Sequence, residues 1–348
     1  PAVGSGGSYV VTGSQTASID ARGTHTNTNN ATFSHDFKLV RDDRGRWRIS
    51  NPPADQIVHA YLLSSVMRSV SVYYWARSDP WLVPDRRFVH AGLSGAAEAL
   101  EMLNRGPAAQ LAPGVAEMPA VTFTSSNLDP AAGELSITVA RAGSTLTSEQ
   151  QERLLAQWVW TLRQFGQLKT LKVGWDDGSA WAGGAASGIG LDSFDEFGPD
   201  ATTGEQLFLI KGGRLARADT SPQGFVPVPV APAATGVTQA AVEPDLSHAY
   251  VVRGGKTLER VPLGEGAAQP LLDGVEIGRP QYSRTRRVWV PVVGRAELRI
   301  WSDRGWQTVT APGLPAGAVI RAIRLSPDAV RLAMVVATPD GQTSLQLS

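Results

Sequence analysis

The feature that most constrains this chain is a repeat of short strands in its C-terminal part. The stretch FLIKGGRLARA, which begins at Phe208, returns as YVVRGGKTLER from Tyr250, 42 positions later. Three further stretches place Pro244, Arg284 and Pro327 in register, at offsets of 40 and 43 residues. A period of about 40 to 45 residues filled with short strands and turns is typical of β-propeller blades.

The repeat predicts that residues 204–348 form part of a β-propeller, with a β-sandwich of accidentally similar strands as the alternative. About four units are visible and the last one is incomplete, whereas propellers usually close with about 4 to 8 full blades. We therefore expect the sequence to end inside a larger propeller.

Residues 1–65 are predicted to form an N-terminal β-rich domain. In ATFSHDFKLVRDDRGRWRISNPP, Phe37 and Leu39 alternate onto one face of a strand, and DDRG forms a turn. Trp47 and Ile49 then share one face of the next strand. A small isolated sheet is only marginally stable in water. We expect this domain to be incomplete or to lean on the rest of the chain.

Residues 66–182 mix strand and helix periods. SVSVYYWA and WLVPDRRFV alternate as strands, GAAEALEMLNRG has apolar residues at helical spacing, and AVTFTSSNLD and ELSITVAR are two more strands. Ser94 is predicted to cap the first helix and Gly106 to end it. With a second helix and a last strand the order is ββαββαβ, which predicts an α+β domain with its helices on one face of a sheet.

The second helix contains LLAQWVWTLRQF, in which Trp158 and Trp160 stand two residues apart. At about 100° per residue the two side chains point in nearly opposite directions, so one core cannot take both. Trp158 falls on the apolar face. Trp160 is predicted to dock the middle domain against the N-terminal sheet or the propeller, or to contact an external protein partner, because an indole buries roughly 150 to 250 Å². The predicted helix limits are Thr147 or Ser148, with Gln150 or Gln151 completing a capping box, and Gly166.

Residues 183–203 are predicted to be a linker. GGAASGIG lacks the Lys-Ser/Thr pair of a phosphate-binding loop and follows a hairpin, which favours a flexible connection. DSFDEF offers the carboxylates of Asp192 and Asp195, but a calcium loop needs more oxygen ligands in a fixed turn. We interpret it as a solvated part of the same linker.

No motif identifies catalytic, cofactor-binding or metal-binding residues. The chain has no cysteine, which excludes disulfides and thiolate chemistry, and it has no HExxH or GxSxG motif. Lysine plus arginine number 32 and aspartate plus glutamate 32, so nucleic-acid binding is not indicated. No apolar run reaches the length of a membrane span. The histidines lack metal-ligand spacing: His25, His35, His59, His90 and His248.

The middle segment resembles the GerMN domain of bacterial spore-germination and envelope lipoproteins. The resemblance rests on LVPDRRFV, AAEALEMLNRGP, LSITV and above all LLAQWVWTLRQFGQLKTLKVGWDDG, where the family has A-Q-aliphatic-V-aromatic-T-L-T-Q followed by a strand and DG. With strands before it and a propeller after it, the order of segments is similar to that of the LpqB family of actinobacterial envelope lipoproteins, over nearly the whole chain.

This resemblance implies an extracytoplasmic, lipid-anchored accessory protein. It implies contact with the extracellular domain of the sensor histidine kinase of the MtrAB two-component system, and an influence on cell-envelope homeostasis and division. The family's signal peptide, lipid-bearing cysteine, helices before the first strands, and later blades are not in this sequence. We therefore expect a soluble fragment, attached to the membrane only through an absent N-terminal anchor and containing no cofactor.

The main hypothesis is a non-enzymatic binding and regulatory protein. The alternative is a hydrolase or a glycan-binding protein with its site in the propeller or at a domain junction. A convergent cluster of titratable groups with perturbed pKa values in a deep pocket would favour that alternative. A purely architectural spacer of the envelope is a third hypothesis.

Overall fold

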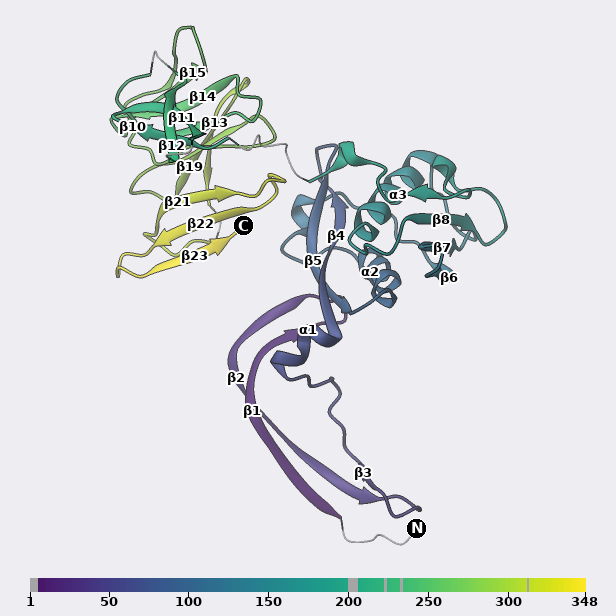
Figure 1. Cartoon of the computed structure of the whole chain (residues 1–348). Helices are drawn as coiled ribbons and strands as arrows, with labels where there is room; N and C mark the ends of the chain where they lie inside the picture. Colours follow the sequence, from purple (N-terminus) through teal and green to yellow (C-terminus); the bar gives the residue numbers. More distant parts are fainter. Residues whose placement is uncertain (1–5, 200–205, 222–223, 232–233, 312) are drawn as a thin grey trace. The chain divides into compact units, whose positions relative to one another are not determined.

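The computed structural model describes residues 6–199, 206–221, 224–231, 234–311 and 313–348 (Figure 1). Within these residues the strands form seven separate sheets and helices are few. The prediction of a mainly β, multidomain chain is confirmed. Residues 1–5 of the predicted first domain and residues 200–203 of the predicted linker lie outside the described residues.

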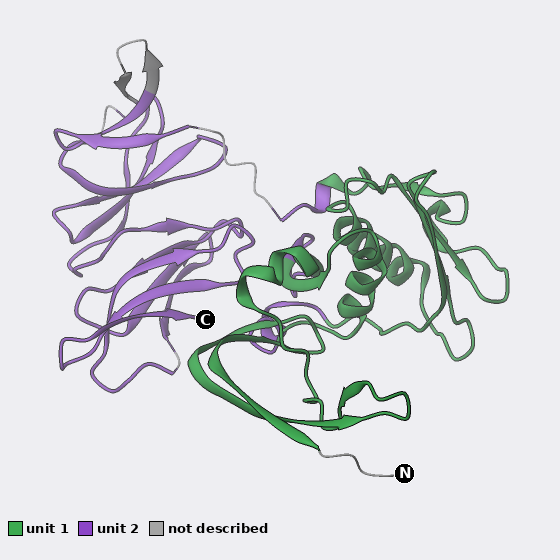
Figure 2. Cartoon of the chain, turned by 60° about the horizontal axis from the view of Figure 1, so that its bottom comes forward, with its two compact units in different colours: residues 1–74, 84–108, 117–195 green, residues 75–83, 109–116, 196–348 purple. Residues whose placement is uncertain are grey.

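The chain divides into two compact units (Figure 2). The first contains residues 1–74, 84–108 and 117–195, and the second contains residues 75–83, 109–116 and 196–348. Two loops of the predicted middle domain thus belong to the unit that contains the repeats.

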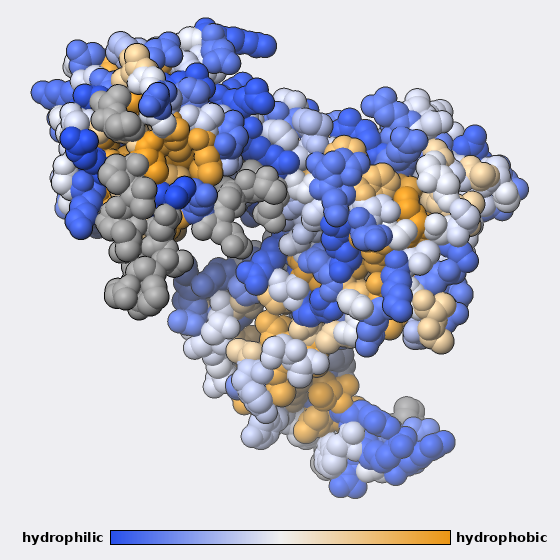
Figure 3. Space-filling view, turned by 45° about the horizontal axis from the view of Figure 1, so that its top comes forward, coloured by the Kyte–Doolittle hydropathy of each residue, from blue (hydrophilic) through white to orange (hydrophobic). Residues whose placement is uncertain are grey.

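The N-terminal strands form an antiparallel sheet without a core of its own. Its strands are β1 (Gly7–Ile19), β2 (His25–Arg41) and β3 (Trp47–Ile49). Leu39 pairs with Ile49 and Arg41 with Trp47, across the turn predicted at DDRG. None of the strand residues is buried, and Figure 3 shows hydrophobic residues (orange) at the surface in this lower part of the molecule. The sheet must therefore be held by contacts with other elements.

The middle segment has the predicted order of elements. They are η1 (Ala60–Leu62), α1 (Leu63–Val66), β4 (Met67–Trp75), β5 (Leu82–His90), α2 (Ser94–Asn104), η2 (Ala112–Gly114), β6 (Phe123–Asp129), β7 (Glu134–Val139), α3 (Ser148–Leu162), β8 (Thr170–Trp175) and β9 (Ile189–Gly190). The prediction of one sheet is wrong: β4 pairs with β5, and β6-β7-β8-β9 form a second sheet. In Figure 1, α2 and α3 lie between the two sheets. The crossover through α3 makes β7 and β8 parallel.

Polar side chains of α3 explain why β4 has a strand neighbour on one edge only. Gln157 Nε2 donates to the Tyr73 carbonyl at 2.9 Å, and Thr161 Oγ1 accepts from the Tyr73 amide at 3.2 Å. Gln164 bonds Ser71 twice: Oε1 accepts from the amide at 2.8 Å and Nε2 donates to the carbonyl at 2.6 Å. Gln157 and Thr161 lie one turn apart on α3, and Gln164 lies in the turn that follows the helix. They occupy a strand edge that would otherwise be open for pairing.

The predicted start of α3 is confirmed, but its predicted end at Gly166 is wrong, because the helix ends at Leu162 and Arg163 is its C-cap. Thr147 Oγ1 accepts from the Gln150 amide at 3.2 Å and Gln150 Oε1 accepts from the Thr147 amide at 3.0 Å, which completes a capping box. Gly106 follows α2 with φ of +90°, a conformation that favours glycine. The prediction for Ser94 is wrong, because α2 begins at Ser94 itself, after Leu93, without a side-chain cap bond.

The core of the middle segment lies between α3 and the four-stranded sheet. Trp158 is 1% exposed, as its position on the apolar face predicts, and Leu171 of β8 is fully buried. Trp181 packs against both Trp158 and Trp175, with ring centroids 5.3 and 4.5 Å away. These indoles supply much of the buried apolar surface of this domain.

The segment predicted as a linker contains regular structure. It includes η3 (Ala182–Gly184), β9 and η4 (Asp195–Phe197). Strand β9 pairs with β8, and the buried Ala185 accepts a hydrogen bond from the Val173 amide through its carbonyl at 3.0 Å. Residues 185 and 189–190 are therefore hydrogen-bonded to strand β8 of the preceding segment.

The repeats form four consecutive antiparallel sheets. They are β10 (Phe208–Lys211), β11 (Arg214–Ser221) and β12 (Gly224–Pro229); β13 (Val237–Val242), β14 (His248–Arg253), β15 (Thr257–Pro262) and β16 (Gln269–Leu272); β17 (Gln281–Tyr282), β18 (Val288–Pro291), β19 (Glu297–Ser302) and β20 (Gly305–Thr310); β21 (Val319–Leu325), β22 (Leu332–Ala337) and β23 (Thr343–Leu347). Three apolar clusters lie between consecutive sheets. This stacking of successive sheets is that of propeller blades.

The first blade lacks the strand that begins the others. Because Phe208 of β10 aligns with Tyr250 of β14 in the repeat, β10 corresponds to the second strand of the next blade. The positions that correspond to β13 instead include the short helix η4. The edge of β10 opposite β11 thus has no strand partner among the described residues.

The hydrogen bonds from α3 to β4 predict a large effect for a single amide. Gln157→Leu keeps the side-chain volume but removes the donor that Gln157 gives to the part-buried Tyr73 carbonyl. We expect the free energy of unfolding to fall by about 1 to 3 kcal/mol, measured by urea unfolding followed by circular dichroism. The matched control is Gln167→Leu, at an exposed position after the same helix, which should change it by less than about 0.5 kcal/mol. Equal effects of the two substitutions would contradict this role of Gln157.

Candidate functional site

The most buried charged side chain among the described residues is Arg87 of β5, whose exposed fraction is 0%. Asp85 stands two residues earlier on the same face of the strand, and its Oδ2 accepts from Arg87 Nη2 at 2.5 Å. The same oxygen accepts from the Ala108 amide at 2.8 Å. A buried ion is tolerated only when it is paired and hydrogen-bonded, and this pair meets that condition.

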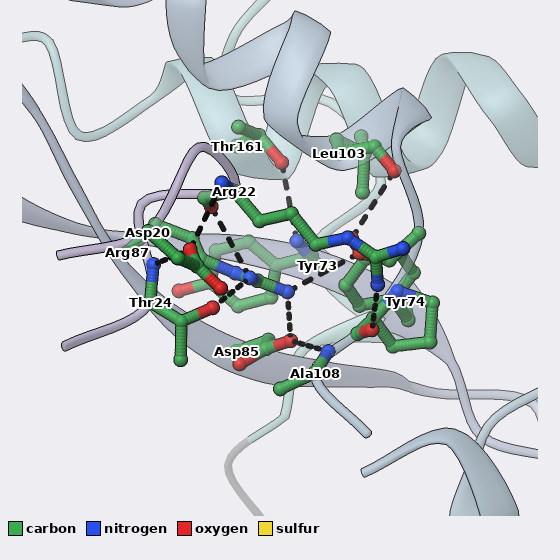
Figure 4. A network of polar contacts seen from close by, with 12 residues as sticks. Asp20, Arg22, Thr24, Tyr73, Tyr74, Asp85, Arg87, Leu103, Ala108 and Thr161 are labelled. Carbon is green, nitrogen blue, oxygen red and sulfur yellow. Dashed lines mark hydrogen bonds and ion pairs between the residues drawn. The ribbon is translucent and has the colours of Figure 1, made fainter. Parts of the chain in front are cut away.

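The guanidinium of Arg87 also holds the turn between β1 and β2 (Figure 4). Its Nη1 donates to Thr24 Oγ1 at 2.6 Å and to the Arg22 carbonyl at 3.2 Å. Its Nη2 donates to the Gly106 carbonyl at 3.2 Å, while Nε is buried without a hydrogen-bond partner among the described residues. One side chain thus joins the N-terminal hairpin, β5 and the end of α2.

The hairpin turn is shaped to receive this side chain. Asp20 Oδ1 accepts from the amides of Arg22 and Thr24 at 2.9 and 2.8 Å. Gly23 has φ of +74°, its carbonyl accepts from the Phe88 amide at 2.8 Å, and a Cβ at this position would overlap the side chain of Met102. Only glycine fits this close approach.

Tyr74 completes the cluster from β4. Its hydroxyl donates to the Leu103 carbonyl at 3.1 Å. Burial raises the pKa of Tyr74 above its ordinary value, and the nearby Arg87 guanidinium opposes this only in part. The hydroxyl therefore stays protonated and acts as a donor. Arg87, Asp85 and Tyr74 each form hydrogen bonds that connect different segments of the chain. This arrangement fits a structural junction better than a catalytic centre.

A second polar cluster lies in the second blade and bears on the hydrolase alternative. The buried carboxylate of Glu243 accepts from Tyr250 Oη at 2.7 Å and from Ser247 Oγ at 2.8 Å, and it pairs with Arg260 Nη2 at 3.3 Å. His248 Nδ1 lies 2.9 Å from Ser247 Oγ and 3.8 Å from the carboxylate. A hydrolase histidine uses its two nitrogens to bridge the hydroxyl and the acid. Here both partners meet the same nitrogen, so the group cannot relay a proton in that way.

The predicted contact residue Trp160 is half-buried on α3. Its Nε1 donates to the Phe194 carbonyl at 2.7 Å, its ring lies 5.4 Å from that of Tyr73, and the Arg163 guanidinium lies 3.6 Å above it. These partners belong to the middle domain and to the segment predicted as linker. That Trp160 docks another domain or an external partner stays a prediction.

Trp81 was not predicted to be a contact residue, yet it is only 7% exposed and lies in the unit that contains the propeller. Its Nε1 donates to the Asp328 carbonyl at 3.0 Å, and the guanidinium of Arg284 lies 4.5 Å from the ring centroid. Nearby, Gly114 approaches Val330 so closely that a Cβ would overlap its side chain. The loops 75–83 and 109–116 are thus packed against the fourth blade. A tryptophan between two prolines, in DPWLVP, was the only sequence signal.

The described residues contain no group of three or more histidine or acidic side chains placed to hold a metal ion. Within the same residues, no helix is long and apolar enough to cross a membrane.

The chain matches two family models. Residues 2–63 match the description "Lipoprotein LpqB, N-terminal domain", and residues 213–347 match "Lipoprotein LpqB beta-propeller domain". The lipoprotein LpqB of Cutibacterium acnes is 24% identical to this chain, over 91% of the chain and 57% of that protein. The LpqB of Rhodococcus opacus is 26% identical, over 87% of the chain and 54% of that protein.

The chain belongs to the LpqB lipoprotein family. It spans about half the length of the curated LpqB relatives that it matches. Among solved structures, the tandem GerMN domains of the sporulation protein GerM from Bacillus subtilis are 14% identical, over 40% of this chain and 48% of that chain, with a TM-score of 0.29. Such a score does not establish a shared fold, so the GerMN resemblance rests on the sequence motifs alone.

The different burial of Trp81 and Trp160 predicts unequal effects of their substitution on stability. Trp81→Ala removes a nearly fully buried indole, and we expect the free energy of unfolding to fall by about 3 to 5 kcal/mol. Trp160→Ala removes one hydrogen bond and part of a half-exposed ring, and about 1 to 2 kcal/mol is expected. Urea unfolding of both variants, followed by circular dichroism, measures the difference. A larger loss for Trp160→Ala than for Trp81→Ala would contradict the packing described for the two residues.

Proposed function

We propose that this chain is part of an extracytoplasmic, membrane-anchored lipoprotein that acts as a non-enzymatic accessory protein. Membership in the LpqB lipoprotein family is the observation that carries the proposal. The two polar clusters around Arg87 and Glu243 support it, because their groups hold strands and turns together and lack the arrangement that hydrolysis needs.

We further propose that the partner is the extracellular domain of a sensor histidine kinase of the MtrAB type, and that binding influences cell-envelope homeostasis and division. The support is the order of segments, in which a GerMN-like middle domain stands between the N-terminal strands and the propeller. The half-exposed Trp160 on the motif helix of that domain is our proposed contact residue. The four-part division at residues 65, 182 and 203 is kept as a working proposal for the domain limits.

The proposal predicts direct, saturable binding. The purified chain should bind an immobilised sensor-kinase extracellular domain of the MtrAB type in surface plasmon resonance, and it should not bind the extracellular domain of an unrelated sensor kinase. Trp160→Ala should weaken the binding by about tenfold, since loss of a central interface tryptophan typically removes more than about 1 kcal/mol. Equal signals from both extracellular domains would contradict the proposed partner. Turnover of an ester or glycoside substrate by the folded chain would contradict the non-enzymatic role.

A further inference from the structure

A hollow of about 840 Å³ lies among the inner strands of the blades. It is lined from four segments of the repeats: residues 206–210, 238–242, 279–284 and 324–327. A second hollow of about 430 Å³ shares four of these residues, Gln239, Arg279, Gln281 and Arg324, and adds Arg321. The two hollows therefore meet at a group of amide and guanidinium side chains.

The arginines at this meeting point have no acidic partners. None of the ion pairs among the described residues includes Arg279, Arg321 or Arg324, and all three residues are exposed. Five other arginines of the propeller are paired with carboxylates, namely Arg253, Arg260, Arg295, Arg299 and Arg331. No described residue that lines the larger hollow is acidic, and Glu276 alone lines the smaller one. In the larger hollow, Arg279 and Arg324 thus carry positive charge that no described carboxylate of the lining pairs with.

The surroundings of these arginines offer the other groups that an extended peptide needs. Arg324 Nη1 donates to Gln281 Oε1 at 3.4 Å, which brings β21 beside the start of β17. Gln239 Oε1 is buried without a hydrogen-bond partner among the described residues. Strands β13, β17 and β21 each begin their sheet, so one edge of each has no strand partner within it. Backbone groups on such edges can bind the main chain of a peptide.

We propose that this hollow binds an acidic peptide segment of a protein partner. The carboxylates pair with Arg279 and Arg324, because a guanidinium matches a carboxylate with two parallel hydrogen bonds. Apolar side chains of the peptide contact the leucine, proline and tyrosine side chains that share the lining, and Gln239 Oε1 accepts from a peptide amide. The proposal deepens the proposed function, on which it rests, by naming the chemistry of a partner segment.

The lining favours a peptide over a glycan or a free anion. Phe208 and Tyr282 are the only aromatic residues among the described residues that line the larger hollow, whereas sugar rings are usually held on aromatic faces. A free phosphate would fill only a small part of about 840 Å³. The formal net charge of the chain is +0, so long-range attraction does not predict non-specific binding of polyanions.

The test measures fluorescence anisotropy of a labelled 12-residue peptide of alternating glutamate and valine, against the full chain at fixed ionic strength. Length-matched peptides of alternating lysine and valine, and of alternating glutamine and valine, are the ligand controls. The double variant R279Q/R324Q should weaken binding of the acidic peptide by about tenfold or more, since two charged hydrogen-bonded contacts are lost. The control R304Q changes an exposed arginine in the turn between β19 and β20 and should leave binding unchanged.

Three outcomes would overturn the proposal: no binding of the acidic peptide, equal binding of the acidic and glutamine peptides, or equal weakening by R279Q/R324Q and R304Q. Displacement of the peptide by millimolar inorganic phosphate with equal effectiveness to unlabelled peptide would also overturn it, in favour of a plain anion site. Binding of the same variants to the immobilised sensor-kinase extracellular domain is measured by surface plasmon resonance. If that domain binds while the acidic peptide does not, the proposed function stands and this inference fails.

Discussion

A buried guanidinium is the central contact that holds the turn of the N-terminal sheet. The sheet β1-β2-β3 has no buried residue, so its position depends on what grips its turn. Arg87 holds that turn: Asp85 neutralises its charge, and Thr24 Oγ1 and the Arg22 carbonyl accept hydrogen bonds from its Nη1. Taking such an ion out of water is costly, and several kcal/mol would be lost if its partners moved away. The same interaction therefore holds the hairpin and makes its displacement unfavourable.

The segment of the motif that contains α3 likewise holds another element in place, strand β4. Strand β4 needs hydrogen-bond partners for its free edge. Gln157 and Thr161 of α3 and Gln164 in the following turn supply them. The apolar residues of that helix meanwhile fill the core around Trp158. The presence of Gln157, Thr161 and Gln164 in the motif is thus explained by their structural role, without a catalytic function. Trp160 of the same motif is only half-buried, and it is our proposed contact residue.

Much of the fold could be predicted from the sequence because it depends on local periodicity. The repeat of 40 to 43 residues predicted the blades, and the alternation around Phe37 predicted the N-terminal strands. The separate sheets could not be predicted, since helical spacing does not reveal that Gln157 and Gln164 bond a strand edge. Nor could the sequence distinguish Arg87 from Arg86: only the strand's orientation buries one and exposes the other. The burial of Trp81 could not be predicted for the same reason, because distant segments determine whether a single indole is buried.

Hydrogen exchange at the Phe88 amide, which donates to the Gly23 carbonyl, can show whether Arg87 fixes the hairpin turn. The measurement compares the wild-type chain with Arg87→Met and with Arg86→Met, the exposed neighbour. Arg87→Met should speed exchange of this amide by about a hundredfold or more, the equivalent of losing one member of a buried ion pair, while Arg86→Met should change it little. Equal protection of the Phe88 amide in all three proteins would show that Arg87 does not hold the turn.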